Sequence, residues 1–227
     1  MSICYARPIL LVVLAVPRFG AQAQSVPADL PSGQLSRHPG NPLVRNGPEK
    51  YDYWKTGPRV VLKVGPSDYR MWYEAVGADT LTCVVLATGR DGLSWTKKGV
   101  VMTPSGMDTW EKKEVSPNSI LVEGGVYRMW YHAGGYPEGS RRMGKAAIGL
   151  ATSPDGLEWT RHAGNPVLET GPAGSIDELQ VAEPRVLRVG KQFRMYYTAQ
   201  DAGKRNVVLS APDDQLVARP EDGDRLL

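Results

Sequence analysis

The chain has 227 residues, with 27 basic and 24 acidic side chains, and its 25 glycines and 18 prolines accompany 41% hydrophobic residues. This length suits one domain or two small ones, and this composition predicts a turn-rich globular protein and excludes a disordered chain. The lysines and arginines form no continuous stripe, so nucleic acid is not an expected partner.

The first residues predict a secretory signal peptide. The apolar run Ile9–Val16 follows Arg7, and an Ala-Gln-Ala cleavage pattern comes after it. The run is too short to span a bilayer, and Arg18 behind it is a departure from the pattern. We expect a signal peptide over residues 1–23, one domain over residues 24–227, a secreted or periplasmic protein, and no membrane contact after cleavage. An ordinary apolar first strand is the alternative.

Removal of the signal peptide leaves a protein that is almost neutral. It takes away two arginines and no acid, so the formal charge falls from +3 to +1, that is 25 basic minus 24 acidic side chains. It also removes Cys4 and leaves Cys83 alone in an apolar stretch, which predicts a buried thiol that packs as a small hydrophobe. The chain has no disulfide framework and no Cys/His zinc spacing, so neither a metal nor another cofactor is expected.

A five-residue aromatic sequence occurs three times. "YRMWY" stands at Tyr69–Tyr73 and Tyr127–Tyr131, and "FRMYY" at Phe193–Tyr197. Each copy ends a longer unit of proline, apolar run, glycine-containing turn and aromatic run, which predicts a β-hairpin. The three hairpin units are Gly57–Ala75, Ser116–Ala133 and Glu183–Ala199.

Further strands are predicted after each hairpin. The third strands are "TCVVLATGRDG", "AAIGLATSPDG" and "NVVLSAPDD", and the fourth are "LSWTKKG", "LEWTRHAG" and, more weakly, "QLVARPE". Four short antiparallel strands per unit predict an all-β fold, a β-propeller of repeated four-stranded blades. Alternation in the aromatic run places Arg and Trp on one face and Tyr and Met on the other. We expect both faces to pack between blades, with the arginine over a ring of the next blade.

About three blades account for the chain, whereas a closed ring needs at least four. Truncation of a longer ring is the preferred explanation, beside an irregular partial propeller or self-association with another copy. A second repeat, in which Ser36–Pro48 resembles Thr160–Pro172, is expected to supply an outermost strand that joins the two ends.

The pattern Y-R-M-W-Y…G-L-A-T-S-P-D-G-L-x-W-x-R…G-N-P-V-L, densest at Val126–Leu168, resembles the five-bladed β-propeller glycosidases. That superfamily includes arabinanases, β-xylosidases, invertases, levansucrases and mannoside phosphorylases. The resemblance covers about residues 36–214. It implies a glycoside hydrolase or phosphorylase that acts on a plant or microbial oligo- or polysaccharide, with a carbohydrate as its partner. The alternatives are a catalytically inactive sugar-binding propeller and a sialidase, because Ser153–Trp159 is similar to the sialidase Asp-box with one residue fewer.

Cleavage of a glycosidic bond needs two carboxyl groups, one an acid with a raised pKa and the other a base or nucleophile. The resemblance places such residues before the proline of each innermost strand, at Gly57, Ser116 and Glu183. It therefore implies that Glu183 is the general acid. Because a proline follows Glu183, we expect an extended backbone at Glu183. Gly57 and Ser116 depart from the family and cannot supply the second carboxylate.

Acidic residues near these positions are candidates for the second carboxylate. Asp52 is preferred because it lies between aromatic residues in the loop before the first blade, and Glu114 is the next candidate. Asp108 and Asp177 are further candidates. The candidate sugar contacts are Trp54, Trp110, His132 and Arg185.

Overall fold

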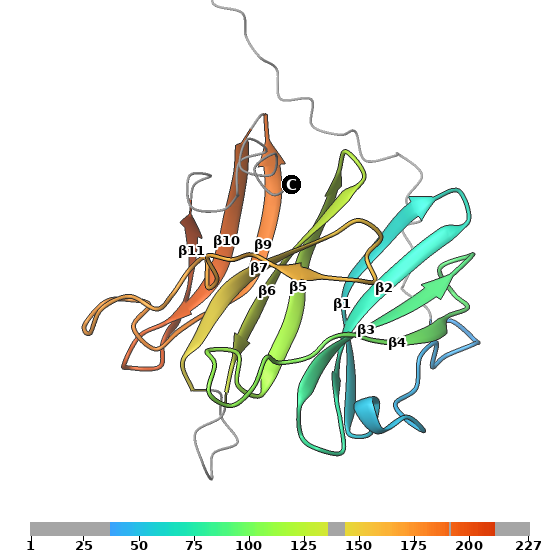
Figure 1. Cartoon of the computed structure of the whole chain (residues 1–227), viewed down its shortest axis with the longest axis horizontal. Helices are drawn as coiled ribbons and strands as arrows, with labels where there is room; N and C mark the ends of the chain where they lie inside the picture. Colours follow the sequence, from blue (N-terminus) through green and yellow to red (C-terminus); the bar gives the residue numbers. More distant parts are fainter. Residues whose placement is uncertain (1–36, 136–143, 191, 212–227) are drawn as a thin grey trace, which may run out of the picture. The chain divides into compact units, whose positions relative to one another are not determined.

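The computed structural model describes residues 37–135, 144–190 and 192–211, and the fold below is that of the unit that begins at Gly40. Its described residues form 11 β-strands and one three-residue 3-10 helix, η1 (Lys50–Asp52) (Figure 1). The predicted all-β fold is confirmed over this part of the chain. No helix within the described ranges is long and apolar enough to cross a membrane.

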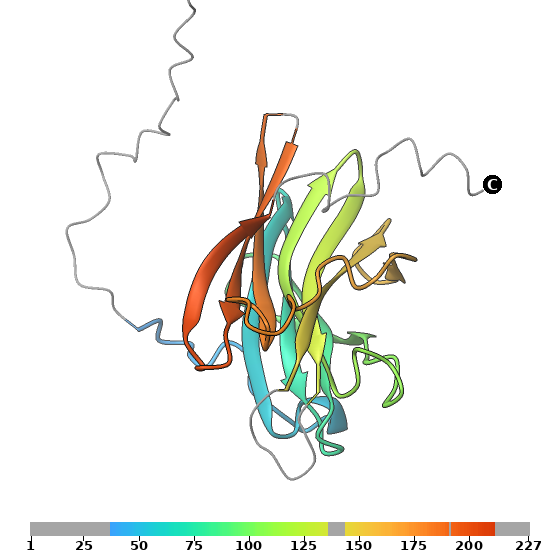
Figure 2. The ribbon, with the colours of Figure 1, turned by 90° about the vertical axis from the view of Figure 1, so that its left-hand side faces the viewer.

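The strands follow one another as three antiparallel units. The first is β1 (Lys55–Gly65), β2 (Asp68–Val76), β3 (Thr82–Gly89) and β4 (Thr96–Met102); the second is β5 (Glu114–Glu123), β6 (Val126–Gly134), β7 (Ala146–Ser153) and β8 (Thr160–Arg161); the third is β9 (Gln180–Val189), β10 (Gln192–Gln200) and β11 (Asn206–Ala211). Within each unit every strand pairs with the next one antiparallel, as the propeller prediction requires. The first strands β1, β5 and β9 are neighbours across the units. Figure 1 shows the three units following one another across the molecule, with the short β8 and β4 aslant to the longer strands, and Figure 2 shows the same ribbon from the side.

Two predictions on the ends of the propeller have different outcomes. The segment 40–48, which was expected to supply a closing strand, contains no strand. It forms turns and bends around two prolines and two glycines, and that expectation was wrong for these residues. The fourth strand predicted at "QLVARPE" and the signal peptide both lie outside the described residues.

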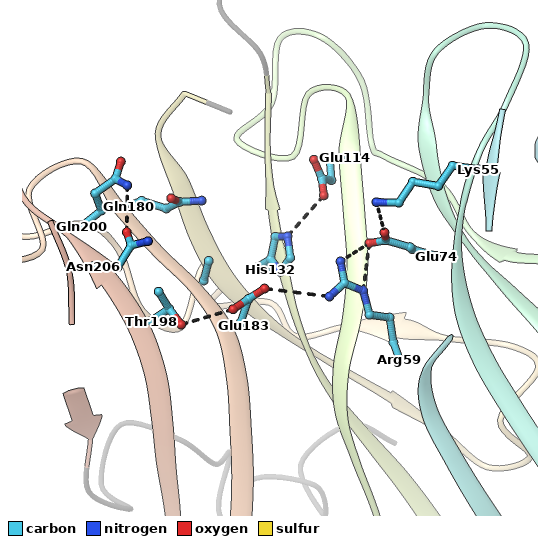
Figure 3. A pocket seen from close by; sticks show the side chains of 11 residues that line it. Lys55, Arg59, Glu74, Glu114, His132, Gln180, Glu183, Thr198, Gln200 and Asn206 are labelled. Atoms are coloured by element: carbon cyan, nitrogen blue, oxygen red, sulfur yellow. Dashed lines mark hydrogen bonds and ion pairs between the residues drawn. The ribbon is translucent and has the colours of Figure 1, made fainter. Parts of the chain in front are cut away.

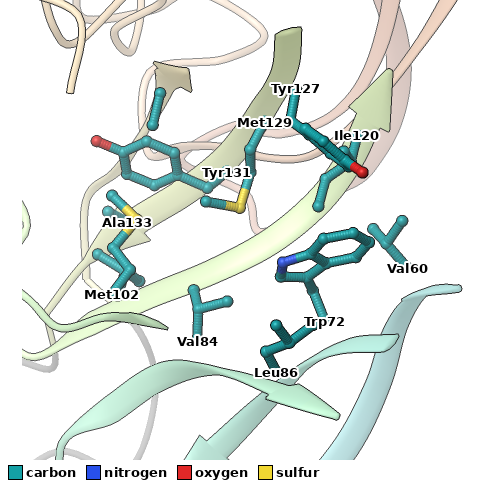
Figure 4. Packing of buried hydrophobic residues seen from close by; sticks show 12 residues of the cluster. Val60, Trp72, Val84, Leu86, Met102, Ile120, Tyr127, Met129, Tyr131 and Ala133 are labelled. Carbon is teal, nitrogen blue, oxygen red and sulfur yellow. The ribbon is translucent and has the colours of Figure 1, made fainter. Parts of the chain in front are cut away.

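The aromatic runs form the packing surfaces between the units. Trp72 packs in the cluster shared with the second unit (Figure 4). Tyr73 packs on the other face of its own unit. Trp130 and Tyr131 divide between two clusters in the same way. The predicted alternation of faces is therefore confirmed. Burial of each such side chain contributes roughly 1.5–3 kcal/mol.

Contacts between the first two units follow the predicted pattern. The Arg70 guanidinium lies 5.5 Å from the centroid of the Tyr127 ring, in the next unit. Trp72 Nε1 donates a hydrogen bond of 2.9 Å to the Gly156 carbonyl, in the Ser-Pro-Asp-Gly turn of the second unit. Gly156 has φ +75°, and a Cβ there would lie 2.7 Å from a Trp72 ring carbon. The glycine thus permits both the turn and the close approach of the tryptophan.

Candidate functional site

A pocket of about 300 Å³ lies where the first strands of the three units are neighbours (Figure 3). Every unit contributes polar side chains to it. The lining residues are Lys55, Arg59 and Glu74 from the first unit, Glu114 and His132 from the second, and Gln180, Ala182, Glu183, Thr198, Gln200 and Asn206 from the third.

One sequence position recurs in the lining of the pocket. The residue directly after each aromatic run is Glu74, His132 or Thr198, and all three line the pocket. Strand register places Glu74 opposite Gly57 and His132 opposite Ser116. The aromatic run before this position is repeated in all three units, whereas the side chain at this position differs from unit to unit.

Glu74 is a buried carboxylate with several donors around it. Its side chain is only 3% exposed. Lys55 and Arg59 form ion pairs with it, Arg59 Nε donates at 2.9 Å, and Ser116 Oγ donates at 2.9 Å. Burial raises the pKa of Glu74, but the hydrogen bonds from Lys55 and Arg59 outweigh burial, so the pKa is lowered. Glu74 is therefore held as an anion.

The absence of a side chain at Gly57 leaves space for the Glu74 carboxylate. A Cβ at Gly57 would lie 3.2 Å from Glu74 Oε1 and 3.3 Å from its Cγ. The carboxylate thus lies beside the position where a side chain of residue 57 would begin. Gly57 and Ser116 carry no carboxylate themselves, but both adjoin this one.

Glu183 is the accessible carboxylate among the three that line the pocket, with its side chain 51% exposed. Thr198 Oγ1 donates a hydrogen bond of 3.3 Å to it, and Arg59 Nη1 lies 3.9 Å from its Oε1. The extended backbone expected before proline was wrong, because Glu183 has φ +53°. A register shift in the β9–β10 pairing lies at this point, and a bulge re-aims the side chain. A left-handed non-glycine residue costs about 1–3 kcal/mol and is typical of functional sites.

Glu114 and His132 form a buried pair on the pocket wall. Their side chains are 6% and 4% exposed, and His132 Nε2 lies 3.2 Å from Glu114 Oε1. Asn118 Oδ1 accepts the backbone N–H of His132 at 3.1 Å, so the ring Nδ1 at 2.9 Å from that same oxygen must also donate. Glu114 Oε2 is buried and has no hydrogen-bond partner among the described residues. His132 therefore contacts one carboxylate oxygen of Glu114, and the other oxygen has no partner among the described residues.

The other candidates from the sequence lie away from the lining. Asp52 is fully buried, forms an ion pair with Lys97, and accepts the Gly47 N–H at 3.0 Å. The structure therefore does not bring Asp52 to Glu183. Asp108 and Asp177 do not line the pocket either.

The aromatic candidates and Arg185 have other surroundings. Trp54 is 63% exposed and meets Tyr53 edge to face. Trp110 stacks on Tyr131 with ring centroids 5.9 Å apart and packs against the core. Arg185 Nη1 donates to the Asn118 carbonyl at 2.7 Å. None of the three candidates is among the lining residues.

The charged lining residues that sequence reasoning missed are Lys55, Arg59 and Glu74. Glu74 follows directly on a repeated aromatic run that indicates scaffold, and its exchange for histidine and threonine in the other copies was the available signal. No group of three or more His, Cys, Asp or Glu side chains in the described ranges is placed to hold a metal ion.

Comparisons with known proteins agree with the fold. Residues 118–219, less than half of the chain, match the model of glycoside hydrolase family 130, described as beta-1,4-mannooligosaccharide phosphorylase. No curated protein matches the chain.

Solved structures share the architecture. Zg3597, a family 117 glycoside hydrolase from the marine bacterium Zobellia galactanivorans, has 21% identity and a TM-score of 0.57, over 68% of this chain and 50% of that one. A candidate glycoside hydrolase from Parabacteroides distasonis has 16% identity and a TM-score of 0.54, over 77% of this chain and 59% of that one. Sucrose-6-phosphate hydrolase from Lactobacillus gasseri has 13% identity and a TM-score of 0.51, over 76% and 32%.

The chain therefore spans little more than half the length of the first two of these structures. At such low identities the likeness shows the fold, and the family-model match adds a sequence relation over residues 118–219. The chain has the fold of the β-propeller glycosidases, and its predicted resemblance to that superfamily is confirmed.

Proposed function

We propose that the chain is a carbohydrate-active enzyme that cleaves glycosidic bonds in this pocket. The observation that carries the proposal is the meeting of Glu74, Glu114 and Glu183, one carboxylate from each unit, around one pocket. A glycosidic bond is cleaved between carboxyl groups that act from its two sides. The family-model match and the fold of the hydrolases support the same class of reaction.

The proposed general acid is Glu183. Its exposed side chain can reach a glycosidic oxygen, whereas the side chains of Glu74 and Glu114 are almost fully buried. Glu114, the second candidate from the sequence, is the proposed partner in place of Asp52, because it lines the pocket and its Oε2 has no hydrogen-bond partner among the described residues. His132 is proposed to orient Glu114 through its contact with Oε1.

A catalytically inactive sugar-binding protein is the second candidate. Gly57 and Ser116 lack the carboxylates of the family pattern, and the buried Glu74 is saturated by ion pairs and a hydrogen bond. Such a protein would bind a carbohydrate in the same pocket without turning it over.

The test is Glu183→Gln, assayed on natural oligosaccharides and on aryl glycosides with a good leaving group, with and without inorganic phosphate. A general acid contributes typically 10²–10⁴-fold when the leaving group needs its proton. We therefore expect a loss of this order on the natural substrate and a much smaller loss on the activated one. A dependence on phosphate would identify phosphorolysis.

The matched control is Glu123→Gln, because Glu123 pairs with Arg188 outside the pocket. It should keep the activity of the wild type on both substrates. Equal activity of Glu183→Gln and wild type would remove Glu183 from the reaction. Sugar binding without turnover by the wild type would favour the inactive binding protein.

A further inference from the structure

In the pocket one arginine faces two carboxylates. Arg59 Nε donates to Glu74 Oε2 at 2.9 Å, and Nη2 bonds the same oxygen. Arg59 Nη1 lies 3.9 Å from Glu183 Oε1, which is beyond hydrogen-bond range (Figure 3). The guanidinium therefore hydrogen-bonds Glu74, whereas with Glu183 it forms only a long ion pair without a hydrogen bond.

Glu74 is the better-fixed of the two anions. Ser116 Oγ donates to it from the second unit, Lys55 pairs with it from the first, and Gly57 leaves room for it. Its burial strengthens the charge interaction with Arg59, whereas the exposed Glu183 offers a water-screened alternative.

We infer that Glu74 is a positioning residue that retains Arg59 and thereby keeps Glu183 able to carry a proton. This inference rests on the proposed function, in which Glu183 is the general acid. A guanidinium bonded directly to Glu183 would favour its ionised form, and an ionised carboxylate cannot protonate a leaving group.

The other charged groups around Glu183 do not compete for this role. Lys55 is paired with Glu74, and His132 and Glu114 bond each other. From β10, Thr198 offers only a neutral hydroxyl. Glu74 thus determines whether Arg59 hydrogen-bonds Glu74 or turns to Glu183.

The experiment replaces Glu74 by glutamine and follows two readouts. Arg59 should turn to Glu183, and the alkaline limb of the pH–rate profile on natural glycosides should move down by about one pH unit or more, the effect of an adjacent opposite charge. The midpoint of Glu183 ionisation, measured by carboxyl-carbon NMR with Glu183→Gln to assign the signal, should move by a similar amount. Glu74→Gln also frees Lys55, so the displacement should persist in Glu74→Gln/Lys55→Gln and disappear in Glu74→Gln/Arg59→Gln.

The matched control is Glu111→Gln. Glu111 is equally buried and also holds an arginine, Arg161, and a hydroxyl, that of Tyr131, but it does not line the pocket. It should lower stability without moving the ionisation of Glu183. A merely structural Glu74 would behave like this control.

Several results separate the two proposals. An unchanged Glu183 midpoint in folded Glu74→Gln overturns the inference and leaves the proposed function standing. A wild type that turns over no glycoside overturns the proposed function, and the NMR titration still decides whether Glu74 controls Glu183. Should Glu74→Gln fail to fold, an experimental wild-type structure decides: a direct Arg59–Glu183 hydrogen bond overturns the inference, and an Arg59 bonded to Glu74 alone supports it.

Discussion

Replacement of Gly156 by alanine should measure how tightly the first two units pack. Gly156 has φ +75°, and its new Cβ would lie 2.7 Å from a ring carbon of the fully buried Trp72. The left-handed backbone costs an L-residue about 1–2 kcal/mol. Overpacking of a dense core costs about 1–3 kcal/mol more. We therefore expect a loss of about 3 kcal/mol in the free energy of unfolding, and about 2–4 °C in Tm for each kcal/mol.

Gly124 is the matched control, because it has φ +57° and no described atom lies within 4 Å of its added Cβ. Gly124→Ala should show the backbone cost alone, about 1–2 kcal/mol. Urea unfolding followed by tryptophan fluorescence measures both variants, and thermal melts check the order. Equal losses in the two variants would show that Trp72 yields to the new methyl group, and the packing argument would then be wrong.

Three further predictions concern ionisation, the thiol and export. Burial raises the pKa of Glu111, but the hydrogen bonds from Arg161, Ser105 and Tyr131 outweigh burial, so the pKa is lowered from 4.5. The stabilisation by Glu111 is therefore present above pH 4.5 and is lost as the pH falls through the folded pKa. The loss of unfolding free energy in Glu111→Gln, measured by urea unfolding, should be larger at pH 7 than at pH 3. Burial raises the pKa of Cys83 to about 12, so a protein without residues 1–23 should resist a thiol reagent at pH 8 and react fully in urea. Material exported by a bacterial host should begin near Gln24, and exported protein that keeps the apolar run would contradict the signal peptide.

The strands were predictable because the same local sequence pattern occurs three times in the chain. Proline, apolar run, turn and aromatic run recur in register, and β1–β2, β5–β6 and β9–β10 all form the expected hairpins. The segment 40–48 could not be judged in this way. It resembles the stretch after β8, but whether such a stretch becomes a strand depends on a free strand edge beside it.

The site was predictable only in part, for a physical reason. Glu183, Glu114 and His132 line the pocket, and each lies at or near a strand start or an aromatic run that the repeats define. Asp52 was chosen for its aromatic neighbours in the sequence, but its partner Lys97 comes from β4, 45 residues later in the chain. An ion pair between residues so far apart in the sequence depends on tertiary packing, and a local sequence pattern does not predict it.

The departures from repetition carry more information than the repeats themselves. In the two identical "YRMWY" copies the scaffold is the same, so a change directly after them cannot be a demand of strand packing alone. That change gives Glu74, which needs Gly57 beside it and Arg59 and Ser116 as donors, and His132, which needs Asn118 and Glu114. Each substitution is accompanied by its own set of partners on the neighbouring first strand. A buried ionisable side chain without such partners would cost several kcal/mol. The partners are therefore the signature of positions that the fold stabilises for a purpose other than packing, and they lead to the same pocket.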